Sequence, residues 1–136
     1  MGKTRRVRRV SEAEGRRLLA KAEEFASAAR ASFEAGRFTA CGLAAVHAAI
    51  SAADAVTADS RLEVSSAADH LEVVKLLRDS LQHGLPPNNE RQLVGLLSVK
   101  NEIEYSGHMV TPAKAKTLLD QATRFVAWSR SVIDAL

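Results

Sequence analysis

The pattern of apolar and polar positions predicts an amphipathic helix in the first long stretch, residues 11–36. Apolar residues recur there every three or four positions, at Leu18, Ala22, Phe25, Ala29 and Phe33. This spacing places them on one face of a helix. Ser11 followed by Glu14 is a capping-box pattern that begins a helix, and Gly36 is a typical helix end.

The next stretch, FTACGLAAVHAAISAADAVTA, is apolar almost all round. A helix of this composition is normally buried at the centre of a domain, and its small residues let neighbouring helices approach closely. Polar side chains are few. His47, Ser51 and Asp54 follow one another at i, i+4 and i+7, so they form a single polar stripe along this predicted helix.

Three further helices are predicted in the second half of the chain. The first begins at Ser65 or Ser66 and has a buried face made of Leu71, Val74, Leu77 and Leu81. The second follows the breaker HGLPPNN and covers residues 90–105 or a little more. The last begins at Thr111, with Pro112 at its first position. With no strand predicted, five helices joined by short links indicate an all-α antiparallel bundle.

Composition agrees with a helical protein of a reducing compartment. Aromatic residues make up only 4% of the chain, whereas strands favour aromatic and β-branched residues. The single cysteine, Cys41, excludes an intrachain disulfide framework. No uninterrupted apolar run reaches the roughly 18 residues that span a membrane, and no apolar segment follows the basic start as in a secretory signal. We therefore expect a cytoplasmic protein that does not enter the membrane.

Positive charge is concentrated at the start of the chain. Residues 1–10 hold five basic residues and no acidic one, and the remainder holds 14 basic against 16 acidic residues. This asymmetry predicts a basic, disordered arm over residues 1–10 followed by a helical domain over residues 11–136. The candidate contacts to nucleic-acid phosphates are Arg5, Arg6, Arg8 and Arg9. The alternative is a solvated chain end without a ligand.

Polar residues interrupt the apolar face of the predicted helix at residues 90–105. On a helical wheel with Leu93 at zero, Lys100 falls at about 340°, Glu104 at about 20° and Asn101 at about 80°. A charged side chain that faces a core costs several kcal/mol unless it is paired. Three explanations remain open: a structural Lys100–Glu104 ion pair, the rim of a subunit interface, or a cleft that holds a ligand. If the helix packs antiparallel against the stripe of His47, the two polar stripes meet in one pocket.

The stretches AAVHAAISAADAVTA and LLSVKNEIEY, each on a predicted helix, resemble the HEPN domains (higher eukaryotes and prokaryotes nucleotide-binding). The resemblance covers residues 11–134. The family signature is an arginine, commonly a polar residue after it, and a histidine four to six residues on. Lys100 stands at the arginine position, Asn101 at the polar position and Tyr105 at the shortest histidine spacing, while His108 lies one residue beyond the longest. Asp54 matches an acidic position of the second long helix.

The resemblance implies a homodimer whose groove binds RNA or a nucleotide, and many HEPN domains are metal-independent ribonucleases of defence or toxin–antitoxin systems. The catalytic candidates that it implies are Lys100, Asn101, Tyr105 and His108. The candidates for a supporting polar groove are His47, Ser51, Asp54 and Glu104. No cofactor or metal is expected, because the histidines and the cysteine lack the spacing of a metal site. The alternative is a catalytically inactive interaction or assembly module that pairs with a partner protein from the same locus.

Overall fold

Six helices and one small sheet form the protein in the computed structural model, which describes residues 7–61, 63–65 and 70–135. The helices are α1 (Glu12–Glu34), α2 (Phe38–Arg61), α3 (His70–Ser80), α4 (Pro87–Ser98), α5 (Lys100–Tyr105) and α6 (Pro112–Asp134). The strands are β1 (Val7–Arg9) and β2 (Glu63–Ser65). The prediction of an all-α helical bundle is confirmed.

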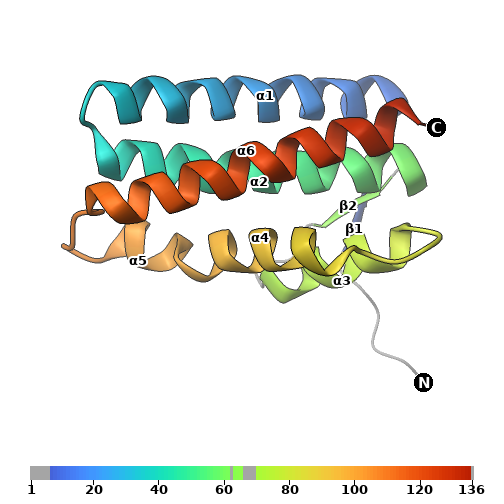
Figure 1. The fold of residues 1–136 in the computed structure, drawn as a ribbon. Helices are drawn as coiled ribbons and strands as arrows, with labels where there is room; N and C mark the ends of the chain where they lie inside the picture. The colour runs from blue at the N-terminus through green and yellow to red at the C-terminus, as the bar shows by residue number, and fades with distance from the viewer. Residues whose placement is uncertain (1–6, 62, 66–69, 136) are drawn as a thin grey trace.

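The central helix of the bundle is α2. In Figure 1, α1 and α6 run antiparallel to each other, and α4 runs antiparallel to α2 and α6. The core lies between these helices, and its largest fully buried side chain is Phe125 of α6. Alanines fill most of the buried positions of α2, so neighbouring backbones pack closely against it. This packing is what positions α5 and the start of α6 on α2.

Local sequence signals begin and end the long helices as expected. The Ser11 side chain accepts a hydrogen bond from the Glu14 backbone N–H at 3.1 Å, and Thr111 caps α6 in the same way through the Lys114 N–H. Gly36 has a φ of +75°, which favours glycine at the link between α1 and α2. At the other end of the bundle, α3 and α4 are joined by an ion pair between Arg78 and Glu90.

The prediction of no strands is wrong, and so is the prediction of disorder for residues 7–9. Strands β1 and β2 pair antiparallel, with Arg8 opposite Val64. Val10 and Val64 are buried against Ala58 in a small second cluster, and this burial holds the pair in place. Strands of three residues carry too little alternation to be recognised from sequence. Residues 1–6 of the predicted arm lie outside the described residues.

The predicted fourth helix is two helices. Val99 separates α4 from α5, and α5 ends at Tyr105 instead of continuing to His108. At Val99 the backbone departs from ideal helical geometry, with φ −101° and ψ −3°, and this one residue interrupts the helix. It sets Lys100 at the start of a short helix of its own.

By length and composition alone, α2 qualifies as a membrane-spanning helix over Phe38–Ser60, although no apolar run of that length was expected. In the bundle, however, 61% of its apolar 18-residue window is buried inside the protein. Core helices of soluble bundles have the same all-round apolar composition. The burial of α2 therefore accounts for its sequence without a bilayer.

Candidate functional site

An ionic cluster joins α5 to α2 where the two predicted polar stripes meet. Lys100 Nζ donates a hydrogen bond to Glu104 Oε2 at 2.9 Å, and His47 Nε2 lies 3.6 Å from Glu104 Oε1. The side chains of Lys100 and Glu104 are each 19% exposed. Lys100 and Glu104 therefore interrupt the apolar face because they pair with each other, and Glu104 also pairs with His47 of α2.

His47 also contacts α1. Its ring lies 5.5 Å from the ring of Phe25, centroid to centroid, with the two planes tilted by 31°. Lys21 lies near the same Phe25 ring, with its Nζ 6.0 Å from the ring centroid, at the limit of a cation–π contact. His47 thus bridges α1 and α5 from its place on α2. Its aromatic contact and its carboxylate contact together orient the imidazole.

The electrostatics of the cluster keep Glu104 ionised at neutral pH. The hydrogen bond from Lys100 lowers the pKa of Glu104 below its ordinary value, and the charges of Lys100 and His47 act in the same direction. A hydrogen bond from Tyr105 lowers this pKa further, whereas burial of the carboxyl opposes the change. A carboxylate with a lowered pKa stabilises the folded state above its ordinary pKa of 4.5.

We expect Glu104→Gln to lower the thermal midpoint at pH 7, because Lys100 and His47 then face a neutral amide. The difference from the parent protein should narrow as the pH falls below 4.5, where the parent carboxyl also becomes protonated. Thermal unfolding followed by circular dichroism, at pH values from 7 downward, measures this difference in the thermal midpoint. Glu102→Gln is the matched control, since Glu102 lies on the same helix but is mainly exposed. Equal midpoints for the two variants at pH 7 would contradict the stabilising role assigned to the Glu104 carboxylate.

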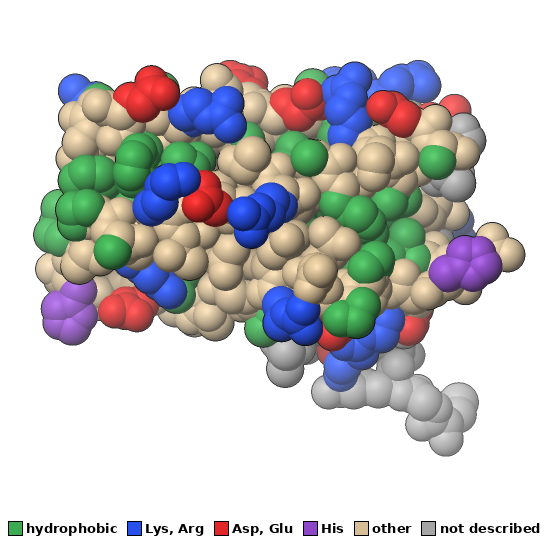
Figure 2. All heavy atoms as spheres, in the orientation of Figure 1, with side chains coloured by type: hydrophobic (Ala, Val, Ile, Leu, Met, Phe, Trp, Pro, Cys, Tyr) green, Lys and Arg blue, Asp and Glu red, His purple; other side chains and the backbone are tan. Residues whose placement is uncertain are grey.

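The other signature residues point outward. Asn101 is exposed, Tyr105 is 80% exposed, and the His108 side chain is 82% exposed. His108 follows α5 in the loop and lies with its Nδ1 3.9 Å from Glu102 Oε1. Met109 is exposed as well, and Figure 2 shows hydrophobic side chains gathered at the end of the bundle where α2 and α6 begin. Of the signature residues, Lys100 therefore points inward, whereas Asn101, Tyr105 and His108 point outward.

Of the α2 stripe, His47 is the residue that pairs with this cluster. Ser51 is buried in the bundle, and the charges that act on Asp54 are those of Arg8 and Lys21. Asp54 is seven residues beyond His47, about 10 Å further along the helix axis. Burial raises the pKa of Asp54 to about 7, and the two cations partly offset this rise. The roles of Ser51 and Asp54 in a supporting polar groove stay predictions.

The basic residues near the N-terminus lie apart from this cluster. Arg8 Nη1 is 3.1 Å from Glu14 Oε1, and Arg9 is exposed on β1. Figure 1 shows β1 and β2 beside α3, away from α5. Arg5 and Arg6 lie outside the described residues. Arg8 and Arg9 therefore do not contribute to the surface around Lys100.

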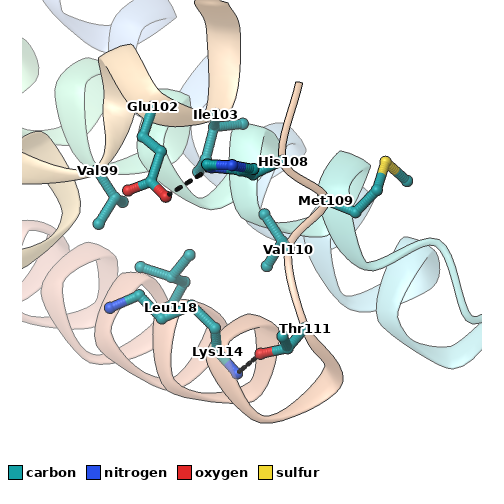
Figure 3. A pocket seen from close by; sticks show the side chains of 9 residues that line it. All are labelled: Val99, Glu102, Ile103, His108, Met109, Val110, Thr111, Lys114 and Leu118. Atoms are coloured by element: carbon teal, nitrogen blue, oxygen red, sulfur yellow. Dashed lines mark hydrogen bonds and ion pairs between the residues drawn. The ribbon is translucent and has the colours of Figure 1, made fainter. Parts of the chain in front are cut away.

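A pocket of about 230 Å³ opens between α5, the following loop and the start of α6. Its lining is Val99, Glu102, Ile103, His108, Met109, Val110, Thr111, Lys114 and Leu118 (Figure 3). Sequence reasoning found His108 but missed Lys114, which it had no reason to separate from the other lysines of an exposed helix. The pocket depends on how α6 packs against α5, and no local pattern encodes that contact.

In the described part of the chain, the structure offers little support for metal binding or for thiol chemistry. No three His, Cys, Asp or Glu side chains gather there in an arrangement that could hold a metal ion. Cys41 is buried, and its burial raises the pKa of the thiol. A thiol in that state is a weak nucleophile, because the reactive species is the thiolate.

These features define a class of protein, namely a small all-helical domain with an ionic cluster and exposed polar residues around a short helix. The sequence model of the HEPN domain matches residues 16–132. The chain therefore belongs to the HEPN domain family, and the resemblance inferred from its sequence is confirmed. A comparison with curated proteins found no match.

Proposed function

We propose that this HEPN domain binds RNA or a nucleotide at the α5 end of its bundle, in a groove between two copies of the chain. The observation that carries the proposal is the exposure of Asn101, Tyr105 and His108 within one short segment beside Lys100. These side chains include an amide, a phenol and an imidazole, which can bind a phosphate, stack on a base and transfer a proton. HEPN domains commonly dimerise, which supports a shared groove.

The cleavage that we propose for this groove needs no metal. The ribose 2′-hydroxyl attacks the adjacent phosphorus, so that a new O2′–P bond forms and the P–O5′ bond breaks. A base takes the proton of the 2′-hydroxyl, and an acid returns a proton to the departing O5′. His108 is the better proton carrier, because the ordinary pKa of histidine lies near neutrality and that of tyrosine near 10. Asn101 orients the phosphate.

Lys100 would stabilise the negative charge that develops on the phosphorane. An ammonium group has three N–H donors, and Glu104 accepts a hydrogen bond from one of them, so the others can point to a phosphate oxygen. Glu104 holds the ammonium in place through the 2.9 Å hydrogen bond. The same contact reduces the net positive charge that a phosphate meets, and this makes Lys100 weaker than a free cation.

The biological setting that we propose is a defence or toxin–antitoxin system, in which the protein acts on cellular RNA. The basic segment would add grip on the phosphate backbone without reading sequence. Arg9 supports this role by its exposure on β1, whereas Arg8 is paired with Glu14. This contact surface is separate from the α5 end, so a bound strand would extend along the bundle.

We expect the purified protein to cut labelled RNA into products with 2′,3′-cyclic phosphate ends. Lys100→Ala and Asn101→Ala should each reduce the rate by about 10²-fold or more, the usual effect of losing a charge-stabilising donor. Gel analysis and mass spectrometry of the product ends measure this. Lys116→Ala is the control, because Lys116 is an exposed lysine of α6 that pairs with Asp120. Unchanged cleavage by Lys100→Ala would remove Lys100 from the mechanism.

A second candidate function is a catalytically inactive interaction or assembly module with a partner protein. The observation that favours it is the state of Lys100, which is only 19% exposed and already paired with Glu104. Lysine also lacks the planar fork with which arginine binds phosphate through two donors. The same RNA assay separates the two functions. If folded, dimeric protein leaves the RNA intact while Lys100→Arg gains cleavage, the inactive module is the better description.

A further inference from the structure

We propose that the pocket between α5 and the start of α6 binds a single nucleotide unit, with its base on the apolar floor and its phosphate at Lys114. This inference rests on the proposed function and assigns it a specific subsite. The unit can belong to a free nucleoside monophosphate or to an RNA strand, since both present the same base and phosphate. The nine lining residues supply an apolar floor, a cationic side and an acceptor side.

The floor is made by aliphatic side chains that rest directly on α2. A Cβ added to Gly42 would lie 3.3 Å from Ile103 Cδ1, 3.3 Å from Leu118 Cδ1 and 3.4 Å from Val110 Cγ2. These three side chains therefore pack against the bare backbone of α2. The pocket above them measures about 230 Å³, less than the roughly 300 Å³ at which pockets for drug-sized ligands begin. A flat group of the size of one base suits this space.

Lys114 supplies the cationic side. Within the described residues, no carboxylate lies at ion-pair distance from its ammonium, in contrast to Lys100 and Lys116, which both have acidic partners. Lys114 also stands in the first turn of α6, a helix of 23 residues, where the helix dipole adds partial positive charge. A phosphate at this side of the pocket meets the ammonium, and the helix dipole adds a weaker attraction.

Glu102 and His108 face Lys114 across the pocket, as Figure 3 shows. Their contact is long, at 3.9 Å, and both side chains are mainly exposed, so a ligand can replace it at little cost. The Glu102 carboxylate can accept hydrogen bonds from the amino group of adenine, cytosine or guanine, whereas uracil carries no such group. The carboxylate repels a phosphate, which fixes the direction in which the nucleotide lies.

His108 connects this pocket to the proposed groove. It lines the pocket and is also the proposed proton carrier of the signature set. A nucleotide unit that lies between Glu102 and Lys114 therefore lies next to the imidazole. In an RNA strand, this unit would be the neighbour of the bond to be cut, and the pocket would select which base stands there.

The test is a titration of the full chain with AMP, CMP, GMP and UMP, followed by ¹⁵N-resolved NMR. We expect shifts at Ile103, Val110 and Lys114, with weaker binding of UMP than of the other three. Lys114→Ala should weaken AMP binding by about fivefold, the effect of about 1 kcal/mol, and leave the binding of adenosine unchanged. Lys116→Ala is the matched control and should bind AMP like the parent. Equal effects of the two lysine variants would overturn the proposal.

A second variant, Val110→Phe, fills the pocket and should abolish AMP binding in protein whose circular dichroism is unchanged. A five-nucleotide RNA distinguishes the two sources of the ligand, because it should compete with AMP if the strand uses this pocket. If both variants bind AMP and cut RNA like the parent, the pocket proposal is overturned and the proposed function stands. If the parent binds neither RNA nor any mononucleotide, both proposals fail.

Discussion

Replacing Phe125 by alanine is expected to lower the free energy of unfolding by about 3–5 kcal/mol, the usual cost of removing a buried phenyl ring. Phe125 is the largest side chain that is fully buried, and its ring lies 5.5 Å from the ring of Trp128 on the same helix. The cavity would open between α6 and α2, where closely packed alanines leave little freedom to collapse. Urea unfolding followed by circular dichroism measures the change.

Phe33→Ala is the matched control for this prediction. Phe33 is only partly buried near the end of α1, where its ring meets the edge of Phe38 at 5.5 Å. Water can enter the space that it leaves, so the loss of stability should be clearly smaller than for Phe125. A loss for Phe125→Ala that does not exceed the loss for Phe33→Ala would show that α6 does not carry the main core.

Asp54→Asn is expected to raise the free energy of unfolding by about 2–4 kcal/mol at pH 8, a rare gain from a single substitution. Burial raises the pKa of Asp54 to about 7 from an ordinary value of 3.8. Above pH 7 the folded protein must therefore hold a poorly solvated carboxylate, which Arg8 and Lys21 only partly stabilise. Asparagine keeps the shape of the side chain and removes the charge.

The sign of this effect follows from proton linkage. Below about pH 4 the carboxyl is protonated in both the folded and the unfolded chain, so the substitution should change stability little. Between about pH 4 and pH 7 the unfolded chain releases the proton first, and the parent protein loses stability as the pH rises. Urea midpoints at pH 5, 6, 7 and 8 measure this slope. Asp120→Asn, at an exposed site that pairs with Lys116, should leave the slope in place. A parallel pH dependence for parent and Asp54→Asn would contradict the assignment.

The sequence predicted the helices well because their signals are local. Ser11 and Thr111 cap α1 and α6 as their positions suggest, and the apolar spacing of α1 identifies its buried face. The features that the sequence did not predict are short or depend on distant residues. The strands β1 and β2 have three residues each, and their stability comes from the burial of Val10 and Val64, which are distant in sequence. The break at Val99 has no glycine or proline to announce it.

The candidate site was predictable only in part. The i, i+4 spacing of Lys100 and Glu104 suggested an ion pair, and the structure contains it at 2.9 Å. The contact of His47 with Glu104 followed from the idea that two polar stripes face each other. For Ser51 and Asp54 the same idea stays a prediction, since Ser51 is buried in the bundle and the charges that act on Asp54 are those of Arg8 and Lys21. The catalytic roles of the signature residues stay predictions.

By itself, the amino-acid sequence determined which segments become helices, which of their faces are buried and which protein family the chain belongs to. Periodicity, caps and breakers act within a few residues, so the chain carries them in readable form. Only the tertiary structure decided that Lys100 and His47 both meet Glu104 while His108 faces solvent, and that Lys114 joins Glu102 around one pocket. These neighbours come from three different helices and a loop, and the packing of whole helices on α2 sets their distances.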